Sequence, residues 1–418
     1  MTEGKRISAG IVAASVAGNA LEFYDFLCFA FFAVYIAGAF FPGGDEWTNL
    51  LKALAVFWSG FLFRPLGGIV IGAYADRVGR RAAMLLTIVL ITVGTAGVAL
   101  TPTYATIGIA APTLLVIFRI VQGFALGGEV GPASVFLVEA APEGKRGFYA
   151  SWQIASQGIA VAAAGLVGVG LSLVLSKQQL SDWGWRVPFL LCLLLVPIAI
   201  YLRQQMPETL FEHSHDEKPD WRNLATHWWW VVLGVLTIIG GTVSTYVGNY
   251  MATYAITTLK LPATLSLSAT LIGGCSTFSF ALLGGWLGDR YGRRVMVIAP
   301  RVALIVLIWP LFLWLSGAPS PLTLYLATIC VSGLTAMSAG IGLVILPELV
   351  PRHVRATAFA VAYAVGVSIF GGSTQFVITW LIGVTHDPTS PAWYVVATSL
   401  VTVGAVALLP ETKGREID

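Results

Sequence analysis

The sequence predicts an all-α membrane protein with twelve transmembrane helices arranged as two pseudo-symmetric six-helix bundles. Composition is the first reason. Of 418 residues, 57% are hydrophobic and 11% are charged, whereas about a quarter of the residues in a soluble domain are charged. The other two reasons are regularly spaced apolar stretches and loop sequences that recur in both halves. This composition excludes a soluble enzyme and a disordered chain, and a net charge of +3 provides no basic surface for nucleic acid.

Apolar stretches close to or above the roughly 20 residues of a bilayer-spanning helix recur along the whole chain. We expect spans at 9–39, 52–74, 82–101, 107–138, 148–174, 185–203, 228–257, 266–288, 295–316, 321–346, 356–384 and 393–409. The first stretch has no small-residue cleavage pattern and is longer than the core of a secretory signal. It is therefore expected to remain as the first helix.

Basic residues predict the orientation of these spans. Of 24 Lys and Arg residues, 17 fall on one face of the scheme, 4 fall on the other, and 3 fall inside spans. Cytoplasmic loops of membrane proteins carry the excess of Lys and Arg. Both termini are therefore expected in the cytoplasm.

Three loop signatures recur at offsets near half the chain length. Residues 72–81 match 285–294, residues 139–146 match 348–355, and residues 207–209 match 410–412. Such repeats are typical of transporters built from duplicated bundles. We expect an N-terminal bundle over 1–203, a cytoplasmic linker over 204–227 and a C-terminal bundle over 228–418.

All six copies of these signatures fall on the expected cytoplasmic face. In the first pair, Gly permits close helix approach, Asp can cap a helix, and Arg can bind phosphates or carboxylates. We expect the loops to act as latches that form and break between states. The proposed gating residues are Asp76, Arg77, Arg80, Asp289, Arg290, Arg293, Glu139, Arg146, Glu348 and Arg355.

These motifs resemble a known family over the whole chain. The repeated G-x-x-x-D-R-x-G-R-R loops resemble the signature of the major facilitator superfamily. Within it, residues 18–26, 63–67 and 119–123 resemble the metabolite:proton symporters, and residues 147–157 are similar to the citrate and tricarballylate branch. The resemblance implies the major facilitator fold, a bacterial-type inner (plasma) membrane, and proton-driven import of a small organic anion, with citrate or another di- or tricarboxylate expected.

Six charged residues fall inside the expected spans, where an ionisable group is costly and usually faces a cavity or a partner. They are Glu22, Asp25, Arg64, Arg119, Glu129 and Arg301. Glu22 and Asp25 share one helical face, and helix rise places them near the bilayer midplane with Arg64 and Arg119. We expect the coupling proton to bind Asp25, Glu22 or Glu129. A static ion pair that fixes helix packing is the alternative.

Arg119 can bind a substrate carboxylate or pair with an acid of the first span. The resemblance also implies that it takes part in proton transfer. Glu129, among glycines, could equally serve helix packing. Arg64 follows a stripe of glycines, which leaves open whether it contacts substrate or is sealed against a neighbouring helix. Arg301 is expected to extend to the cytoplasmic headgroups and to contribute nothing to transport.

Uncharged polar residues form two rows at a spacing of four. Tyr149, Gln153 and Gln157 follow one face of span 148–174, and Tyr246, Tyr250 and Tyr254, with Asn249, follow one face of span 228–257. We interpret the rows as opposed walls of a polar site. The proposed substrate-binding residues are Arg119, Arg64, Gln122, Asn19, Tyr149, Gln153, Gln157, Asn249 and Tyr250.

The sequence favours no resident cofactor, with protons as the coupling ion. It lacks a nucleotide-binding G-x-x-x-x-G-K-[ST] motif, and its four cysteines show no metal-ligand spacing. We expect a non-enzymatic protein that works as a monomer in the lipid bilayer. The alternatives are a proton symporter for a zwitterion such as proline or betaine, or for shikimate or 2-oxoglutarate. An uncoupled facilitator or a membrane nutrient sensor also stays open.

Overall fold

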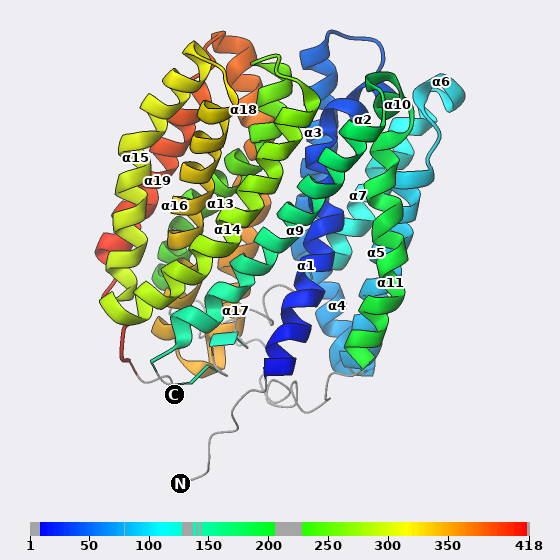
Figure 1. The fold of residues 1–418 in the computed structure, drawn as a ribbon. Helices are drawn as coiled ribbons and strands as arrows, with labels where there is room; N and C mark the ends of the chain where they lie inside the picture. Colours follow the sequence, from blue (N-terminus) through cyan, green and yellow to red (C-terminus); the bar gives the residue numbers. More distant parts are fainter. Residues whose placement is uncertain are drawn as a thin grey trace.

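The computed structural model describes residues 9–78, 80–127, 137–138, 141–142, 144–204 and 228–415. Within these ranges every regular element is a helix, and most helices run side by side along one axis (Figure 1). The first half contains α1 (Ala9–Phe31), α2 (Ala33–Phe40), α3 (Glu46–Leu62), α4 (Arg64–Val78), α5 (Arg80–Leu100), α6 (Tyr104–Ile107), α7 (Ala110–Gly127), α9 (Arg146–Val174), α10 (Lys177–Asp182), η1 (Gly184–Arg186) and α11 (Val187–Gln204). The second half contains α13 (Trp228–Thr257), α14 (Ala263–Tyr291), α15 (Arg293–Gly317), α16 (Pro321–Leu349), α17 (Arg352–Val365), the π-helical η4 (Gly366–Gly371), α18 (Gly372–Thr385) and α19 (Ser390–Leu408).

In the part of the chain that the structure describes, the helices follow the twelve expected spans. Nine described segments are long and apolar enough to cross a membrane, and a bent pair, α1 with α2, makes a tenth. Two shorter apolar helices, Leu85–Leu100 and Gly184–Pro197, occupy the places of the third and sixth spans. The predicted all-α, twelve-helix class is therefore confirmed.

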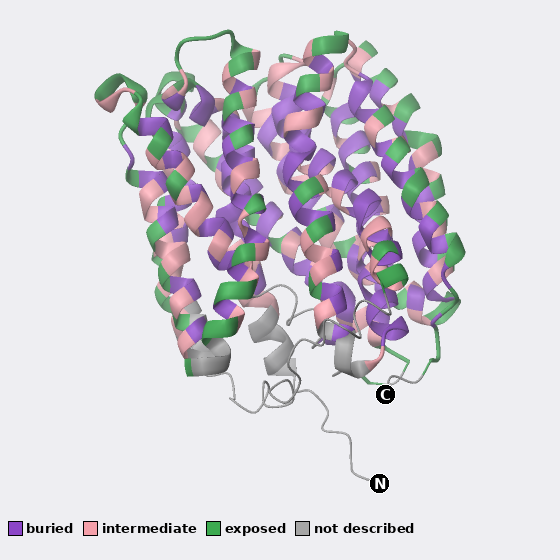
Figure 2. Cartoon of the chain, turned by 180° about the vertical axis from the view of Figure 1, so that it is seen from behind, coloured by how far each residue is buried: buried purple, intermediate pink, exposed green. Residues whose placement is uncertain are grey.

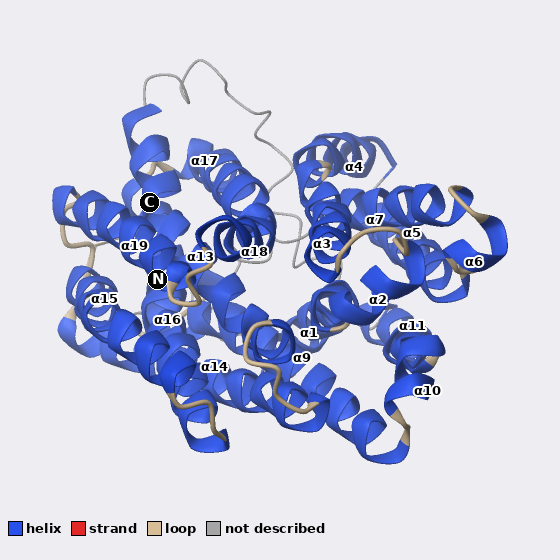
Figure 3. Ribbon diagram, turned by 90° about the horizontal axis from the view of Figure 1, so that it is seen from above, coloured by secondary structure: helices blue, strands red, loops and turns tan. Residues whose placement is uncertain are grey.

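The helices form two bundles that meet along α9 and α14 (Figure 3). Glycines permit this close approach: a β-carbon at Gly158 would lie 2.5 Å from the backbone nitrogen of Phe278, and one at Gly274 would lie 2.2 Å from that of Ala162. α1 begins and α19 ends at the same end of the molecule (Figure 1). Beyond Gln204, the expected linker of 204–227 lies outside the described residues.

The surface of the bundles is apolar, as contact with lipid requires. Large hydrophobic side chains such as Ile69, Leu194 and Val306 are more than half exposed. Figure 2 shows exposed and intermediate residues on the outer sides of the helices and buried residues between them. Since the outside is apolar, the polar groups buried inside are the ones that need a functional explanation.

Candidate functional site

A small cavity lies between the two bundles. Its lining comprises Phe23, Ile154 and Gln157 from the first bundle and Thr237, Ile238, Gly241, Thr242, Thr245, Tyr246, Ser338, Ala339, Gly342, Leu343, Tyr363 and Val367 from the second. Its volume is about 50 Å³, enough for only a few water molecules at roughly 10–15 Å³ each. The bundles must therefore move apart before an organic molecule can enter.

Within the first bundle, a glutamine joins a buried cation to a buried carboxylate. Nη1 of Arg119 donates to Oε1 of Gln122 at 2.8 Å, and Nε2 of Gln122 donates to Oδ2 of Asp25 at 2.7 Å. Nε2 of Gln122 also approaches Oγ1 of Thr95 at 3.1 Å. α1 and α7 thus bring together three of the predicted residues. The Gln122 side-chain amide therefore bridges Asp25 and Arg119 by hydrogen bonds.

Aromatic rings surround the Arg119 guanidinium. Its central carbon lies 4.2 Å from the ring centroid of Phe26, 4.6 Å from that of Phe29 and 5.2 Å from that of Phe57. Nε and Nη2 of Arg119, and Oδ1 of Asp25, are buried without a hydrogen-bond partner. Buried polar atoms are normally satisfied. This pair therefore has unused capacity for an anion and for a proton.

Arg64 lies at the boundary between the bundles. Its guanidinium packs against the rings of Phe26 and Phe61, with centroid distances of 4.3 and 4.1 Å. It is near enough to Glu22, and to Tyr246 and Tyr363 of the second bundle, for electrostatic interaction. Since both tyrosines line the cavity, the Arg64 side chain extends toward the cavity wall.

The glycine stripe around Arg64 packs against α7 over part of its length. A β-carbon at Gly60 would lie 2.9 Å from the carbonyl oxygen of Arg119, and one at Gly68 would lie 3.1 Å from that of Gly127. Nothing lies within 4 Å of a β-carbon at Gly72. The helix that carries Arg64 is thus packed against α7, while the Arg64 side chain is directed to the boundary, and its contact with substrate stays a prediction.

The predicted row on α9 does not act as one wall. Nδ2 of Asn19 donates to Oγ of Ser156 at 2.5 Å, and Nε2 of Gln153 donates to Oδ1 of Asn19 at 3.1 Å. These bonds join α1 to α9, and the side-chain amides of Asn19 and Gln153 are hydrogen-bonded to each other. Tyr149 packs beside Phe148 near the start of the helix, with ring centroids 6.1 Å apart. Only Gln157 of this row lines the cavity.

The row on α13 diverges in the same way. Tyr246 lines the cavity and packs edge-on against Phe61, with ring centroids 5.4 Å apart. Tyr250 accepts a hydrogen bond from Thr379 at 2.7 Å, and Tyr254 donates to the carbonyl oxygen of Pro388 at 2.8 Å. Both contacts lie inside the second bundle, and Asn249 is only half-buried. A spacing of four advances about 40° per step on a helix, which turns each successive tyrosine away from the cavity.

Arg301 corrects the sequence interpretation. Its side chain is fully buried, so the expected extension to the headgroups is wrong. Nε donates to Oγ of Ser338 at 2.7 Å, and Nη1 donates to the carbonyl oxygen of Gly240 and to Oγ of Ser244, both at 2.8 Å. Neutral acceptors on α13 and α16 hold the guanidinium in the interior.

Several residues of the cavity lining were not predicted from the sequence. The cavity hydroxyls of Thr237, Thr242, Thr245, Ser338 and Tyr363 carry no distinctive sequence pattern, because Ser and Thr are common in membrane helices. Glu22 is half-buried near Arg64. Glu129 and Glu139 lie outside the described residues, as do the side chains of Asp76, Arg77 and Arg80.

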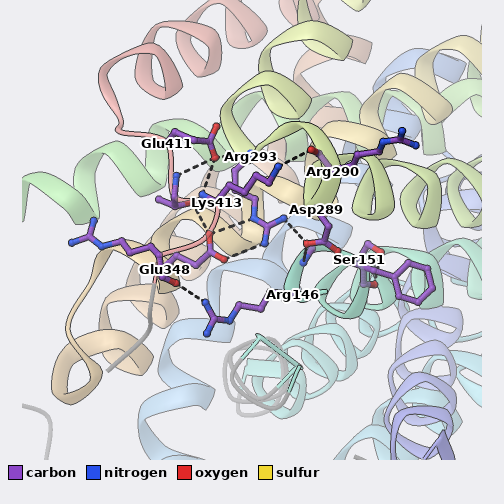
Figure 4. A network of polar contacts seen from close by, with 12 residues as sticks. Arg146, Ser151, Asp289, Arg290, Arg293, Glu348, Glu411 and Lys413 are labelled. Carbon is purple, nitrogen blue, oxygen red and sulfur yellow. Dashed lines mark hydrogen bonds and ion pairs between the residues drawn. The ribbon is translucent and has the colours of Figure 1, made fainter. Parts of the chain in front are cut away.

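A carboxylate at the end of α14 connects the two bundles on the side where α1 begins and α19 ends. Oδ1 and Oδ2 of Asp289 accept hydrogen bonds from the backbone N–H groups of Gly147 and Phe148, each at 2.8 Å. Nη1 of Arg293 lies 2.6 Å from Asp289, and Nη2 of Arg293 lies 3.3 Å from Glu348 (Figure 4). Three predicted gating residues, Asp289, Arg293 and Glu348, therefore meet the start of α9, where the predicted gating residue Arg146 also lies.

The segment after α19 completes this network. Oγ1 of Thr412 donates to Glu348 at 2.5 Å, and Nη1 of Arg146 donates to the carbonyl oxygen of Arg415 at 2.8 Å, which is a second link between the bundles. Glu411 accepts from the backbone N–H groups of Arg293 and Arg294 at 2.8 and 3.0 Å. The repeat at 410–412 was the sequence signal for Glu411 and Thr412, which the predicted gating set omitted.

Two other predicted gating residues have different partners. The carbonyl oxygen of Arg290 accepts from Nζ of Lys413 at 2.7 Å (Figure 4), while its guanidinium lies 5.8 Å from the ring centroid of Trp286. Nε of Arg355 donates to the carbonyl oxygen of Pro347 at 2.8 Å. This hydrogen bond lies within the second bundle.

Comparison with known proteins agrees with this architecture. The family model described as Major Facilitator Superfamily matches residues 26–373. A citrate-proton symporter of Salmonella typhi is 38% identical over 96% of this chain and 93% of its own length, and one of Klebsiella pneumoniae is 39% identical over 94% and 89%. A proline/betaine transporter of Salmonella typhimurium is 34% identical over 99% of this chain and 85% of its own length. The crystal structure of a D-xylose-proton symporter superposes with a TM-score of 0.78 at 20% identity, covering 98% of this chain and 99% of that chain.

Proposed function

Since the chain belongs to the major facilitator superfamily, we propose that it is a proton-coupled symporter that imports a small organic anion. Citrate or another di- or tricarboxylate is the proposed substrate. The similarity to two citrate-proton symporters over nearly the whole chain supports this substrate class. Protons are the proposed coupling ion, and no resident cofactor is proposed.

The observation that carries the proposal is the chain of contacts from Asp25 through Gln122 to Arg119. With Asp25 ionised, its charge offsets that of Arg119. Protonation of Asp25 leaves the Arg119 guanidinium as an uncompensated cation, which favours a substrate carboxylate. By thermodynamic reciprocity, a bound anion then favours protonation of Asp25 to the same extent. Proton and anion binding are thereby coupled.

The charge around the cavity favours an anion over a zwitterion. Arg64, Arg119 and Arg301 are buried in the bundles, while Asp25 and Glu22 are the acids on the neighbouring face of α1. A betaine site would need free aromatic faces around its ammonium group. The rings of Phe26 and Phe61 already face the two arginines of the first bundle, which leaves Phe23, Tyr246 and Tyr363 as the aromatic residues of the cavity lining. Proline and betaine remain the second candidate because of the 34% identical relative.

We further propose that both termini lie in the cytoplasm of a bacterial-type plasma membrane and that the monomer is the working unit. The bias of basic residues supports this orientation. In alternating access, the bundles would rock about the glycine-lined contact of α9 with α14, and the contacts of Asp289 and Arg146 would break as the cytoplasmic side opens.

Proteoliposomes containing the purified full chain test this function. Labelled citrate should accumulate above its external concentration under an imposed inward proton gradient, and a protonophore should abolish accumulation. Equilibration without proton dependence would indicate a facilitator, and binding without uptake would indicate a sensor. A thermal-shift panel of citrate, succinate, 2-oxoglutarate, shikimate, proline and glycine betaine identifies the substrate class, because a ligand stabilises the folded state in proportion to ln(1 + [L]/Kd).

A further inference from the structure

Arg301 is a buried cation that the coupling scheme leaves unused. An arginine side chain has five N–H donors. Three of those on Arg301 bind Ser338, Gly240 and Ser244, whereas Nη2 has no partner. In the described part of the chain, no carboxylate forms an ion pair with it. A guanidinium at membrane depth without a counter-ion is costly and marks a functional position.

Nη2 of Arg301 lies directly behind the cavity wall. A β-carbon at Gly241 would be 3.3 Å from Nη2 and 3.7 Å from Cβ of Ala339. Gly241, Ser338 and Ala339 all line the cavity between the bundles. Because Gly241 has no side chain, an anion in a widened cavity can approach the two unused donors.

We propose that Arg301 is a second carboxylate-binding group, whose Nη2 donates to a carboxylate of the transported acid from the C-terminal side of the cavity. This inference rests on the proposed function and names the group that would hold the substrate against the second bundle. Arg119 and Arg301 belong to different bundles, and an acid with two or more carboxylates has one carboxylate for each of them. A monocarboxylate or a zwitterion can engage only one.

A role in helix packing alone does not account for this arrangement. The bonds of Nε and Nη1 already join α15 to α13 and α16. Packing requires neither the two free donors on Nη2 nor a glycine between them and the cavity.

Two substitutions separate these roles in binding measurements on the purified full chain with citrate as the probe. Arg301→Gln removes the charge and the Nη donors. Gly241→Ala keeps Arg301 and covers Nη2 with a methyl group, whose nearest contacts of 3.3 and 3.7 Å require little adjustment. Gly404→Ala is the matched control, since it is exposed on α19 and nothing lies within 4 Å of its β-carbon.

We expect Arg301→Gln to weaken citrate binding by about 10- to 100-fold, as loss of a charge-assisted hydrogen bond implies. Gly241→Ala should weaken it by about 10-fold, and Gly404→Ala should leave it unchanged. In the Arg301→Gln background, Gly241→Ala should have no further effect, because the group that it covers is absent.

Three outcomes would overturn the inference. Citrate affinity within about twofold of wild type in both variants would remove Arg301 from the site. A Gly241→Ala effect that persists in full beside Arg301→Gln would show that the methyl acts by filling space. Absence of binding by every carboxylate to the wild-type chain would reject the proposed function itself, and this inference with it. If Arg301→Gln does not fold, the citrate affinity of Gly241→Ala is compared with that of Gly404→Ala, and equal affinities would overturn the inference.

Discussion

The two bundles hold their buried cations in different ways. In the first bundle, Arg119 is linked through Gln122 to the carboxylate of Asp25. In the second bundle, Arg301 is held by hydroxyl and carbonyl oxygens without a described carboxylate partner. The first arrangement can gain and lose a proton, whereas the second carries a fixed charge. Coupling is therefore expected to be a property of the first bundle, with the second supplying binding.

This asymmetry contrasts with the loops, where the repeat is retained. The G-x-x-x-D-R-x-G-R-R signature occurs at the end of α4 and again at the end of α14. Duplication has preserved the turns that set the architecture, while the interior has diverged in chemistry. Fold symmetry is therefore a poor guide to which bundle carries the proton.

Removal of the Arg119 guanidinium is the strongest way to break this comparison. Arg119→Ala should reduce citrate uptake in proteoliposomes by at least about 100-fold, because it removes a desolvated cation and leaves Asp25 and Gln122 without it. Arg186→Ala, in the same bundle but bound to the Thr101 carbonyl oxygen at 2.7 Å, should keep most of the uptake. Wild-type uptake by Arg119→Ala, with an unchanged unfolding midpoint, would exclude Arg119 from the site.

Neutralising Asp25 should separate coupling from binding. Asp25→Asn mimics the protonated side chain, so Arg119 stays uncompensated and the anion can still bind and exchange. We expect citrate counterflow to remain within a few-fold of wild type while accumulation driven by a proton gradient is lost. Glu22→Gln is the comparison on the same helix. Normal accumulation by Asp25→Asn would instead assign the coupling proton to Glu22 or Glu129.

The close contact of Gly123 with Gly60 holds α7, the helix that carries Arg119, against α3. A β-carbon at Gly123 would lie 1.7 Å from the carbonyl oxygen of Gly60, so Gly123→Ala must push α7 away from α3. We expect a loss of about 2–3 kcal/mol in the free energy of unfolding. Gly72→Ala should cost less than about 0.5 kcal/mol, since nothing lies within 4 Å of its β-carbon. Equal thermal-unfolding midpoints for Gly123→Ala and Gly72→Ala would show that α7 can move away from α3 without loss of stability.

The spans could be predicted from the sequence because the bilayer fixes helix length and excludes polar surface. The link between Asp25 and Arg119 was also accessible, since charges at membrane depth are few and must find partners. The burial of Arg301 was not, because Gly240, Ser244 and Ser338 are neutral, lie on two other helices and show no periodic pattern. Hydroxyl groups that line the cavity were equally hidden. Thr237 and Thr245 hydrogen-bond to their own helix backbone at 2.8 and 2.9 Å, as such residues do throughout membrane helices.

The smallest expected effect concerns the cap that Glu411 places on α15. Burial alone would raise the pKa of this carboxyl, but hydrogen bonds from the backbone N–H groups of Lys413, Arg293, Arg294 and Thr412 lower it below the ordinary value of 4.5. A carboxyl whose pKa is lower in the folded than in the unfolded state stabilises the fold above its unfolded pKa. That stabilisation is lost as the pH falls through the folded pKa.

Glu411→Gln should therefore lower the free energy of unfolding by no more than about 1 kcal/mol at neutral pH, because the carboxyl is partly exposed. The difference from wild type should narrow as the pH falls below 4.5, and thermal unfolding across this range measures it. Asp182→Asn, which alters an exposed carboxylate that accepts from the Gln178 side chain, is the control. A difference that does not change with pH would mean that Glu411 acts by shape and not by charge. Glu208, which lies outside the described residues, is the repeat partner of Glu411. Glu208→Gln would test whether the first bundle also depends on its copy of the motif.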